Sequence, residues 1–133
     1  MRLYVTATFR GAENRAEIEA LCALVEAAGW ESFCFVRDIE HWEHVFDDPA
    51  DLMQRSLREI MRCDALLLDM ASKPTGRAIE AGMAYATGRP VIVILPRGLP
   101  IKATVRGIAD AVIEYGPLAD IVPRLARLHQ EWA

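Results

Sequence analysis

Among the side chains of this sequence, Glu80 lies in the context best suited to taking part in a chemical reaction. The apolar run Ala65–Asp69 predicts a buried strand, and a Pro/Gly turn joins it to a helix of small residues expected to begin near Gly76. Strand, loop and helix in this order build ligand sites in parallel sheets. Unpaired backbone N–H groups and the helix dipole at such a start favour an ionised carboxylate. Glu80 is therefore a candidate nucleophile or charge-stabilising group, or else a dipole-matching acid on an exposed helix start.

Further candidate ligand-binding residues flank the ends of the two strands expected nearest to Glu80. The first expected strand, residues 3–7, contains Tyr4 and leads into a turn. The polar and glycine positions at these strand ends are Thr8, Arg10, Gly11, Asp69, Thr75, Gly76 and Arg77. A helix N-terminus with an arginine can hold a phosphate while a carboxylate addresses an electrophilic carbon. This set suits a sugar phosphate, although Tyr4 also fits a core position and Arg10 a solvated loop.

Residues 37–48 are rich in charged and aromatic side chains and have no clean period. We interpret this segment as a lid over the site, or else as a surface excursion, because exposed aromatic side chains in a loop favour a partner. Trp42 is a candidate to stack on a nucleobase. His41, Glu43 and His44 resemble part of a metal site, but no distant third ligand accompanies them, so we expect neither a metal nor another cofactor.

The rest of the chain supplies the elements that must position these residues. Strands are expected near residues 3–7, 32–36, 65–69, 91–95 and 111–114, and helices near residues 14–28, 49–61, 76–87, 104–109 and 117–130. Asp48 and Pro49 mark the start of the second helix. Its expected buried positions are Leu52, Met53, Leu57, Ile60 and Met61, with Ser56 on the same side.

Strands that alternate with helices predict a single α/β domain over residues 1–133. We expect a flavodoxin-like or Rossmann-like sandwich with five parallel strands in the order 2-1-3-4-5. That order reverses between strands 1 and 3, so the ligand crevice should lie where the loops after these strands meet. The side chains expected to converge on this one pocket are Tyr4, Thr8, Arg10, Asp69, Gly76, Arg77 and Glu80.

Composition argues against several classes of partner and location. The 133-residue chain is 53% apolar and 26% charged, which is typical of a folded soluble domain, and its net charge of −4 argues against nucleic acid or an anionic membrane. We expect neither a membrane-spanning segment nor a signal peptide. Cys22, Cys34 and Cys63 lack paired spacing and fit buried free thiols in a reducing compartment. A cytoplasmic location is therefore expected.

Four segments, residues 3–11, 63–69, 76–86 and 105–110, resemble in order the nucleoside 2-deoxyribosyltransferase family. The likeness is greatest to its branch of 2'-deoxynucleoside 5'-phosphate N-hydrolases. The resemblance implies that Glu80 attacks C1' of the deoxyribose and forms a covalent glycosyl-enzyme, which water or a second base then resolves. It also implies a nucleoside 5'-monophosphate as the small-molecule partner.

The same resemblance assigns roles to further positions. It implies that Tyr4 orients the nucleophile and that Thr8 and Arg10 lie near the phosphate. Lys102 falls near a position that a neighbouring subunit contributes to the phosphate site. The resemblance therefore implies a homodimer with a shared active site.

Three positions depart from the family pattern. Ser56 stands where an aspartate is usual on the helix before strand 3, Pro74 replaces a small hydroxyl residue, and Ala7 replaces a glycine. Loss of a well-placed general acid typically costs on the order of 10²–10⁴ in rate. Asp69 and Asp38 are the candidate substitutes.

These departures keep a second function open, a nucleotide sensor that has kept the pocket and lost catalysis. A receiver-type signalling domain shares the expected topology and has a phosphorylatable aspartate where Asp69 lies, but residues 5–8 offer no acids to hold magnesium. A flavin-binding module is disfavoured because no Ser/Thr-rich phosphate loop follows the first strand.

Overall fold

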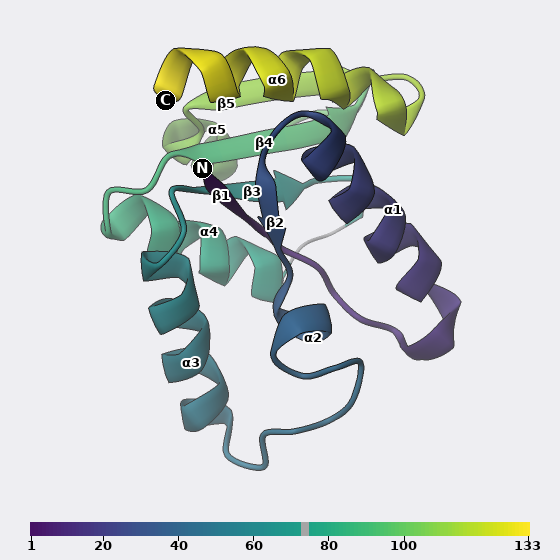
Figure 1. Cartoon of the computed structure of the whole chain (residues 1–133). Coiled ribbons are helices and arrows are strands. Elements are labelled where there is room, and N and C mark those ends of the chain that lie inside the picture. The colour runs from purple at the N-terminus through teal and green to yellow at the C-terminus, as the bar shows by residue number, and fades with distance from the viewer. Residues whose placement is uncertain (73–74) are drawn as a thin grey trace.

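The computed structural model describes residues 1–72 and 75–133, which form a five-stranded parallel sheet with helices on both faces (Figure 1). The strands are β1 (Arg2–Val5), β2 (Glu31–Phe33), β3 (Ala65–Asp69), β4 (Val91–Pro96) and β5 (Ala111–Tyr115). Their order in the sheet is β2-β1-β3-β4-β5. The predicted α/β class, parallel sheet and strand order are therefore confirmed.

Helices connect the strands in the described part of the chain. In chain order these are η1 (Gly11–Glu13), α1 (Arg15–Ala27), α2 (Phe35–Asp38), α3 (Pro49–Met61), α4 (Gly76–Ala86), α5 (Ala103–Ile108), η2 (Leu118–Asp120) and α6 (Ile121–Trp132), of which η1 and η2 are single 3-10 turns. No helix among these residues is long and apolar enough to cross a lipid bilayer.

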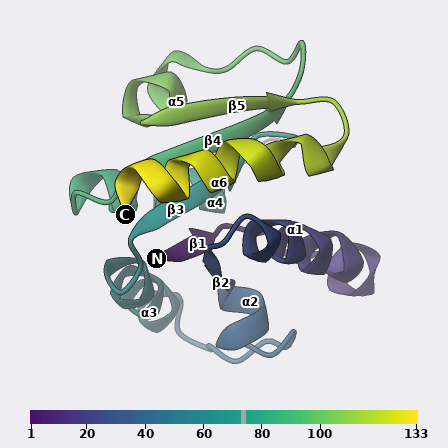
Figure 2. The ribbon, with the colours of Figure 1, turned by 45° about the horizontal axis from the view of Figure 1, so that its top comes forward.

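Successive side chains of the strands point to opposite faces of the sheet and build two hydrophobic cores. Leu3 and Val5 of β1 pack with α1 and α6, whereas Tyr4 packs with α3, α4 and α5. In Figure 2, α6 passes in front of the sheet and α4 lies behind it. Because Tyr4 pairs with Leu66 across β1 and β3, Leu66 and Leu68 share the face of Tyr4. The three cysteines are buried free thiols, as predicted.

The second strand is shorter than the sequence predicts. A strand is expected over residues 32–36, but β2 ends early and the chain turns into α2. The Asp38 carboxylate accepts a hydrogen bond from the backbone N–H of Cys34 at 2.9 Å, which closes this turn. Phe35 and Val36 stay buried within α2, so their apolar character reflects burial and not a strand.

The predicted start of α3 is confirmed. The Asp48 side chain accepts a hydrogen bond from the backbone N–H of Ala50 at 2.9 Å, and Pro49 is the first residue of the helix. Ser56 points inward as expected and is 4% exposed. The expectation that Met61 is buried is wrong, because this residue ends the helix and is 48% exposed.

Candidate active site

A cavity of about 500 Å³, here called the first cavity, lies at the carboxyl ends of β1 and β2. Its walls come from the loop after β1, from α2 and residues 40–44, from the first half of α3, and from the start of α4. It borders the loop after β1 and the start of α4, on one side of the region where the strand order predicts a ligand crevice. The volume lies within the range of about 300–1,000 Å³ that is usual for small-ligand sites.

Glu80 and Tyr4 meet at the wall of the first cavity. Tyr4 is fully buried, and its hydroxyl faces Glu80 and Ser56, although it makes no hydrogen bond of regular geometry with any described residue. Burial raises the pKa of Glu80 to about 7, and the Tyr4 hydroxyl and the charge of Arg77 oppose that rise. Burial and the neighbouring Glu80 carboxylate also raise the pKa of Tyr4. A carboxyl perturbed in this way inside a cavity is a candidate for catalysis.

A second cavity, of about 410 Å³, lies between the loop after β1, the start of α1 and the ends of β3 and β5. Asp69 stands in its wall, where one carboxylate oxygen accepts hydrogen bonds from the Ala71 backbone N–H at 2.9 Å and from the Tyr115 hydroxyl at 3.1 Å. Burial raises the pKa of Asp69, and both donors and the charge of Arg77 oppose that rise. Asp69 therefore has its own partners and does not share a cavity with Glu80.

The structure divides the predicted site residues between these cavities. Those on the first cavity are Tyr4, Trp42, Gly76 and Glu80. Those on the second cavity are Thr8, Arg10, Asp69 and Arg77. Gly11, Thr75 and Lys102 line neither cavity, and the departure at Pro74 lies outside the described residues. The expected single pocket is therefore two cavities, which adjoin at Ala7 because this residue lines both.

The alternation of side chains along β3 explains the position of Asp69. On β1 alternation does not separate the cavities, because Tyr4 and Val5 both line the first one. On β3, Leu68 shares the face of Tyr4, so the next residue, Asp69, points to the opposite face. The expectation that Asp69 joins Glu80 in one pocket is wrong for this geometric reason.

Arg77 holds the loop between β3 and α4. Its guanidinium donates hydrogen bonds to the Asp69 carbonyl and to the Ser72 hydroxyl, both at 2.7 Å, and the residue is 7% exposed. Its Nε has no hydrogen-bond partner within the described residues. Two of its three nitrogens are thus committed to the loop, from where its charge acts on Glu80.

Asn14 fixes the loop that presents Thr8 and Arg10. Its side chain accepts a hydrogen bond from the Arg10 backbone N–H at 2.8 Å and donates one to the Thr8 carbonyl at 2.6 Å. Gly11 turns the loop with a φ of 73°, a conformation that favours glycine. Asn14 directly precedes α1, but its side chain makes no capping bond to that helix. Sequence reasoning therefore missed this residue as a positioning group.

Trp42 stands at the wall of the first cavity and is fixed by its own contacts. Its ring meets Phe9 edge-on with centroids 5.3 Å apart, and the Arg15 guanidinium lies 4.7 Å from its centre. Its backbone N–H donates to the Val36 carbonyl at 2.8 Å, and its φ of 65° lies in the left-handed region. These contacts hold the ring beside the cavity, where stacking on a base stays a prediction.

Glu40 is a site residue that sequence reasoning missed. It follows α2, is half-buried and lines the first cavity together with Glu80. Burial raises the pKa of Glu40, and the charge of Glu40 contributes to the raised pKa of Glu80. The aperiodic segment 37–48 contains several acids, and no pattern in it distinguishes Glu40 from Glu43.

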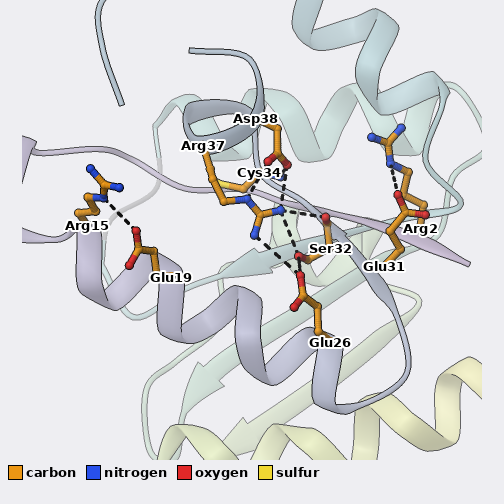
Figure 3. A network of polar contacts seen from close by, with 9 residues as sticks. All are labelled: Arg2, Arg15, Glu19, Glu26, Glu31, Ser32, Cys34, Arg37 and Asp38. Atoms are coloured by element: carbon orange, nitrogen blue, oxygen red, sulfur yellow. Dashed lines mark hydrogen bonds and ion pairs between the residues drawn. The ribbon is translucent and has the colours of Figure 1, made fainter. Parts of the chain in front are cut away.

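Asp38 belongs to a separate polar network (Figure 3). Arg37 donates to both Asp38 carboxylate oxygens, at 2.8 and 2.9 Å, and to the Ser32 carbonyl at 3.0 Å. The Ser32 hydroxyl in turn donates to Glu26 at 2.6 Å. Asp38 lines neither cavity, so neither substitute acid expected from the sequence reaches the wall that holds Glu80.

The charged side chains of residues 41–44 lie at the surface. His41, Glu43 and His44 are exposed, and the last two line the first cavity. In residues 1–72 and 75–133, no three or more histidine, cysteine or acidic side chains are grouped to hold a metal ion. His44 instead places positive charge near Glu40, which lowers the pKa of that carboxyl against the larger effect of burial.

Comparisons with known proteins identify the fold. No family model matches the sequence, and no curated protein matches it. The CMP N-glycosidase BcmB of Clostridium botulinum is similar in structure, with a TM-score of 0.69 and 22% identity over 96% of this chain and 99% of that one. A 2-deoxyribosyltransferase of Bacillus psychrosaccharolyticus has a TM-score of 0.70 and 20% identity over 91% and 90%. A signal receiver domain of Vibrio parahaemolyticus has a TM-score of 0.55 and 14% identity over 98% and 90%. At these identities the likeness establishes a shared fold.

Proposed function

We propose that this protein cleaves or exchanges the N-glycosidic bond of a nucleoside 5'-monophosphate with Glu80 as the nucleophile. The observation that supports the proposal is the position of Glu80 beside the buried Tyr4 hydroxyl at the wall of a cavity of about 500 Å³. The fold shared with a CMP N-glycosidase and a 2-deoxyribosyltransferase is consistent with this kind of reaction.

In the proposed reaction, an oxygen of the Glu80 carboxylate attacks C1' and the bond from C1' to the base nitrogen breaks. Water resolves the glycosyl-enzyme in a hydrolase, and a second base resolves it in a transferase. The nearby Tyr4 hydroxyl favours the ionised carboxylate, because a hydrogen bond to the charged form stabilises that form. With a pKa of about 7, Glu80 is partly ionised at neutral pH and available as a nucleophile.

The phosphate is proposed to bind where the two cavities adjoin. Gly76 opens α4, and backbone N–H groups at a helix N-terminus favour an anion. Thr8 and Arg10 stand on the second cavity, and Ala7 lines both cavities. A phosphate at this boundary would leave the sugar and the base in the first cavity beside Glu80.

A nucleotide sensor without turnover is the second candidate function, and Ser56 is the observation that favours it. Ser56 is buried and lines the first cavity from α3, where the family resemblance implies an aspartate. A serine hydroxyl does not replace a carboxylic acid as a proton donor at neutral pH. A sensor would therefore bind the nucleotide and release no base.

We also propose a homodimer formed through α3 and α4. These helices pack together and expose Met61, Ile79 and Tyr85 to 48%, 54% and 58%. Ile79 also lines the first cavity, so a second copy seated here would border the site. Lys102, which is exposed at the start of α5, is the residue that the resemblance assigns to a neighbouring site.

The test follows base release from a panel of ribo- and deoxynucleoside 5'-monophosphates by chromatography, with binding titrations in parallel. We expect wild type to release base from at least one nucleotide. Glu80→Gln should abolish release and retain binding, because it keeps the shape of the side chain and removes its charge. Glu114→Gln, an exposed position on β5, is the matched control and should behave as wild type.

Each other outcome of this experiment has a definite meaning. Binding without release by wild type would establish the sensor. Release that persists in Glu80→Gln would remove Glu80 as the nucleophile. Neither binding nor release of any nucleotide would overturn the nucleotide assignment.

A further inference from the structure

Glu40 is a partly buried carboxyl held in place just past α2. Its backbone N–H donates to the Phe35 carbonyl at 3.1 Å, and its own carbonyl accepts from the Glu43 backbone N–H at 3.0 Å. The side chain lines the same cavity as Glu80. Because the charge of Glu40 acts on the pKa of Glu80, the two carboxyls lie close enough to interact.

The other acids near the site are engaged elsewhere or lie at the rim. Asp69 faces the second cavity, and Asp38 is bonded to Arg37 and to the Cys34 backbone. Among the residues that the structure describes, Glu43 is the one further acid on the first cavity, and it is exposed. Glu40 is therefore the partly buried carboxyl that accompanies Glu80.

We propose that Glu40 is the acid–base residue of the first cavity, a catalytic group that protonates the departing base and then activates water. This inference rests on the proposed function. The family resemblance implies an aspartate on α3 for this proton transfer, but Ser56 occupies that position here. Glu40, in the segment after α2, would take over the role. Two carboxyls on one cavity match the requirement of glycosidic cleavage for one nucleophile and one proton donor.

Each step balances with these two residues. In the first step, an oxygen of Glu80 bonds to C1', the C1'–N bond breaks, and the released electron pair on the base takes the proton from the Glu40 carboxyl. In the second step, a water oxygen bonds to C1' and gives its proton to the Glu40 carboxylate. The bond from C1' to Glu80 breaks with its electron pair returning to Glu80, so both residues regain their starting forms.

Charged and polar groups around the pair act on both carboxyls. The proposed first step needs Glu80 ionised and the proton on Glu40. The Tyr4 hydroxyl and the Arg77 charge favour ionised Glu80, whereas burial and the charge of Glu40 raise its pKa to about 7. The other titratable groups on this cavity are Cys34, Glu43 and His44, of which His44 favours ionised Glu40.

The test compares wild type, Glu40→Gln and Asp47→Asn on two substrates. One is the nucleotide that wild type cleaves best, and the other is a 4-nitrophenyl 2-deoxyribose 5-phosphate, whose nitrophenolate leaves without a proton. Glu40→Gln should lower kcat on the nucleotide by about 10²–10⁴-fold. The burst of nitrophenolate should keep its wild-type rate, and azide should restore turnover by trapping the glycosyl-enzyme without a base.

Asp47 is an exposed acid of the same segment that lines neither cavity, so its variant should match wild type.

The outcomes separate this inference from the proposed function. Wild type without base release would overturn both. Wild-type release with an unchanged kcat in Glu40→Gln would overturn the role of Glu40 alone. A raised KM with unchanged kcat and no azide effect would also overturn it, because Glu40 would then recognise the base and transfer no proton. Loss of the alkaline limb of the kcat profile in Glu40→Gln would support the acid role.

Discussion

At the scale of residues, the site places groups where folding alone would not favour them. Glu80 is a carboxyl whose pKa burial raises to about 7, and Tyr4 is a fully buried phenol without a regular hydrogen bond to the described residues. Both features oppose stability, since a partly buried charge and an unpaired buried hydroxyl each cost free energy. A site that needs a reactive carboxylate accounts for them better than a structural role does.

This cost predicts that Glu80→Gln stabilises the fold at alkaline pH. The pKa of Glu80 rises from 4.5 to about 7 on folding, so the fold favours the protonated form. The stability that protonation gives is present below pH 4.5 and is lost as the pH rises through about 7. At pH 8 the variant should be more stable than wild type by on the order of 2 kcal/mol, and at pH 4.5 nearly equal. Urea unfolding at both pH values measures the difference in free energy of unfolding. A difference that does not grow with pH would contradict this account. Glu114→Gln is the control.

At the scale of elements, the alternation of side chains along the strands predicts on which face of the sheet Asp69 lies. Side chains of β1 and β3 alternate between the two layers, and the pairing of Tyr4 with Leu66 fixes which residues share a face. That register places Asp69 on the face of the sheet opposite to Tyr4. Alternating the residues of β3 between the two faces would have predicted this from the sequence. The turn of α2 could not be found in this way. A bond from the Cys34 backbone N–H to the Asp38 side chain closes this turn, and apolar Phe35 fits a strand equally well.

The start of α3 supports a prediction of stability at this scale. Asp48 accepts a hydrogen bond from the Ala50 backbone N–H at 2.9 Å, and α3 presents Ser56 to the first cavity. Asp48→Ala should lower the free energy of unfolding by about 1 kcal/mol, because it removes the capping bond. Asp47→Ala removes a neighbouring exposed acid without a capping bond and should change little. Urea unfolding of both variants makes the comparison, and equal losses would show that the cap contributes nothing specific.

At the scale of the whole molecule, the fold was predictable and the site was predictable in part. Alternating apolar strands and helices determine the parallel sheet and its order, and the reversal of that order locates the region of the two cavities, which adjoin at Ala7. The division into two cavities and the inward position of Glu40 depend on packing of α2 and of the loops, which no periodic pattern encodes. The sequence of one chain also does not specify which partner covers the exposed apolar residues on α3 and α4.

A second copy of this chain is the partner proposed for that face, and a charge placed on it should prevent assembly. Tyr85 is 58% exposed on α4, and Tyr85→Glu would place a carboxylate where apolar surface must be buried. Sedimentation equilibrium should show a dimer for wild type and a monomer for Tyr85→Glu. Ala119→Glu adds the same charge at an exposed position in η2, away from α3 and α4, and should stay dimeric. If Lys102 serves the neighbouring site, the Tyr85→Glu monomer should also bind nucleotide more weakly than wild type. A monomeric wild type would contradict the shared site, because every residue of the first cavity would then come from one chain. A Tyr85→Glu variant that still forms dimers would contradict the proposed interface on α3 and α4.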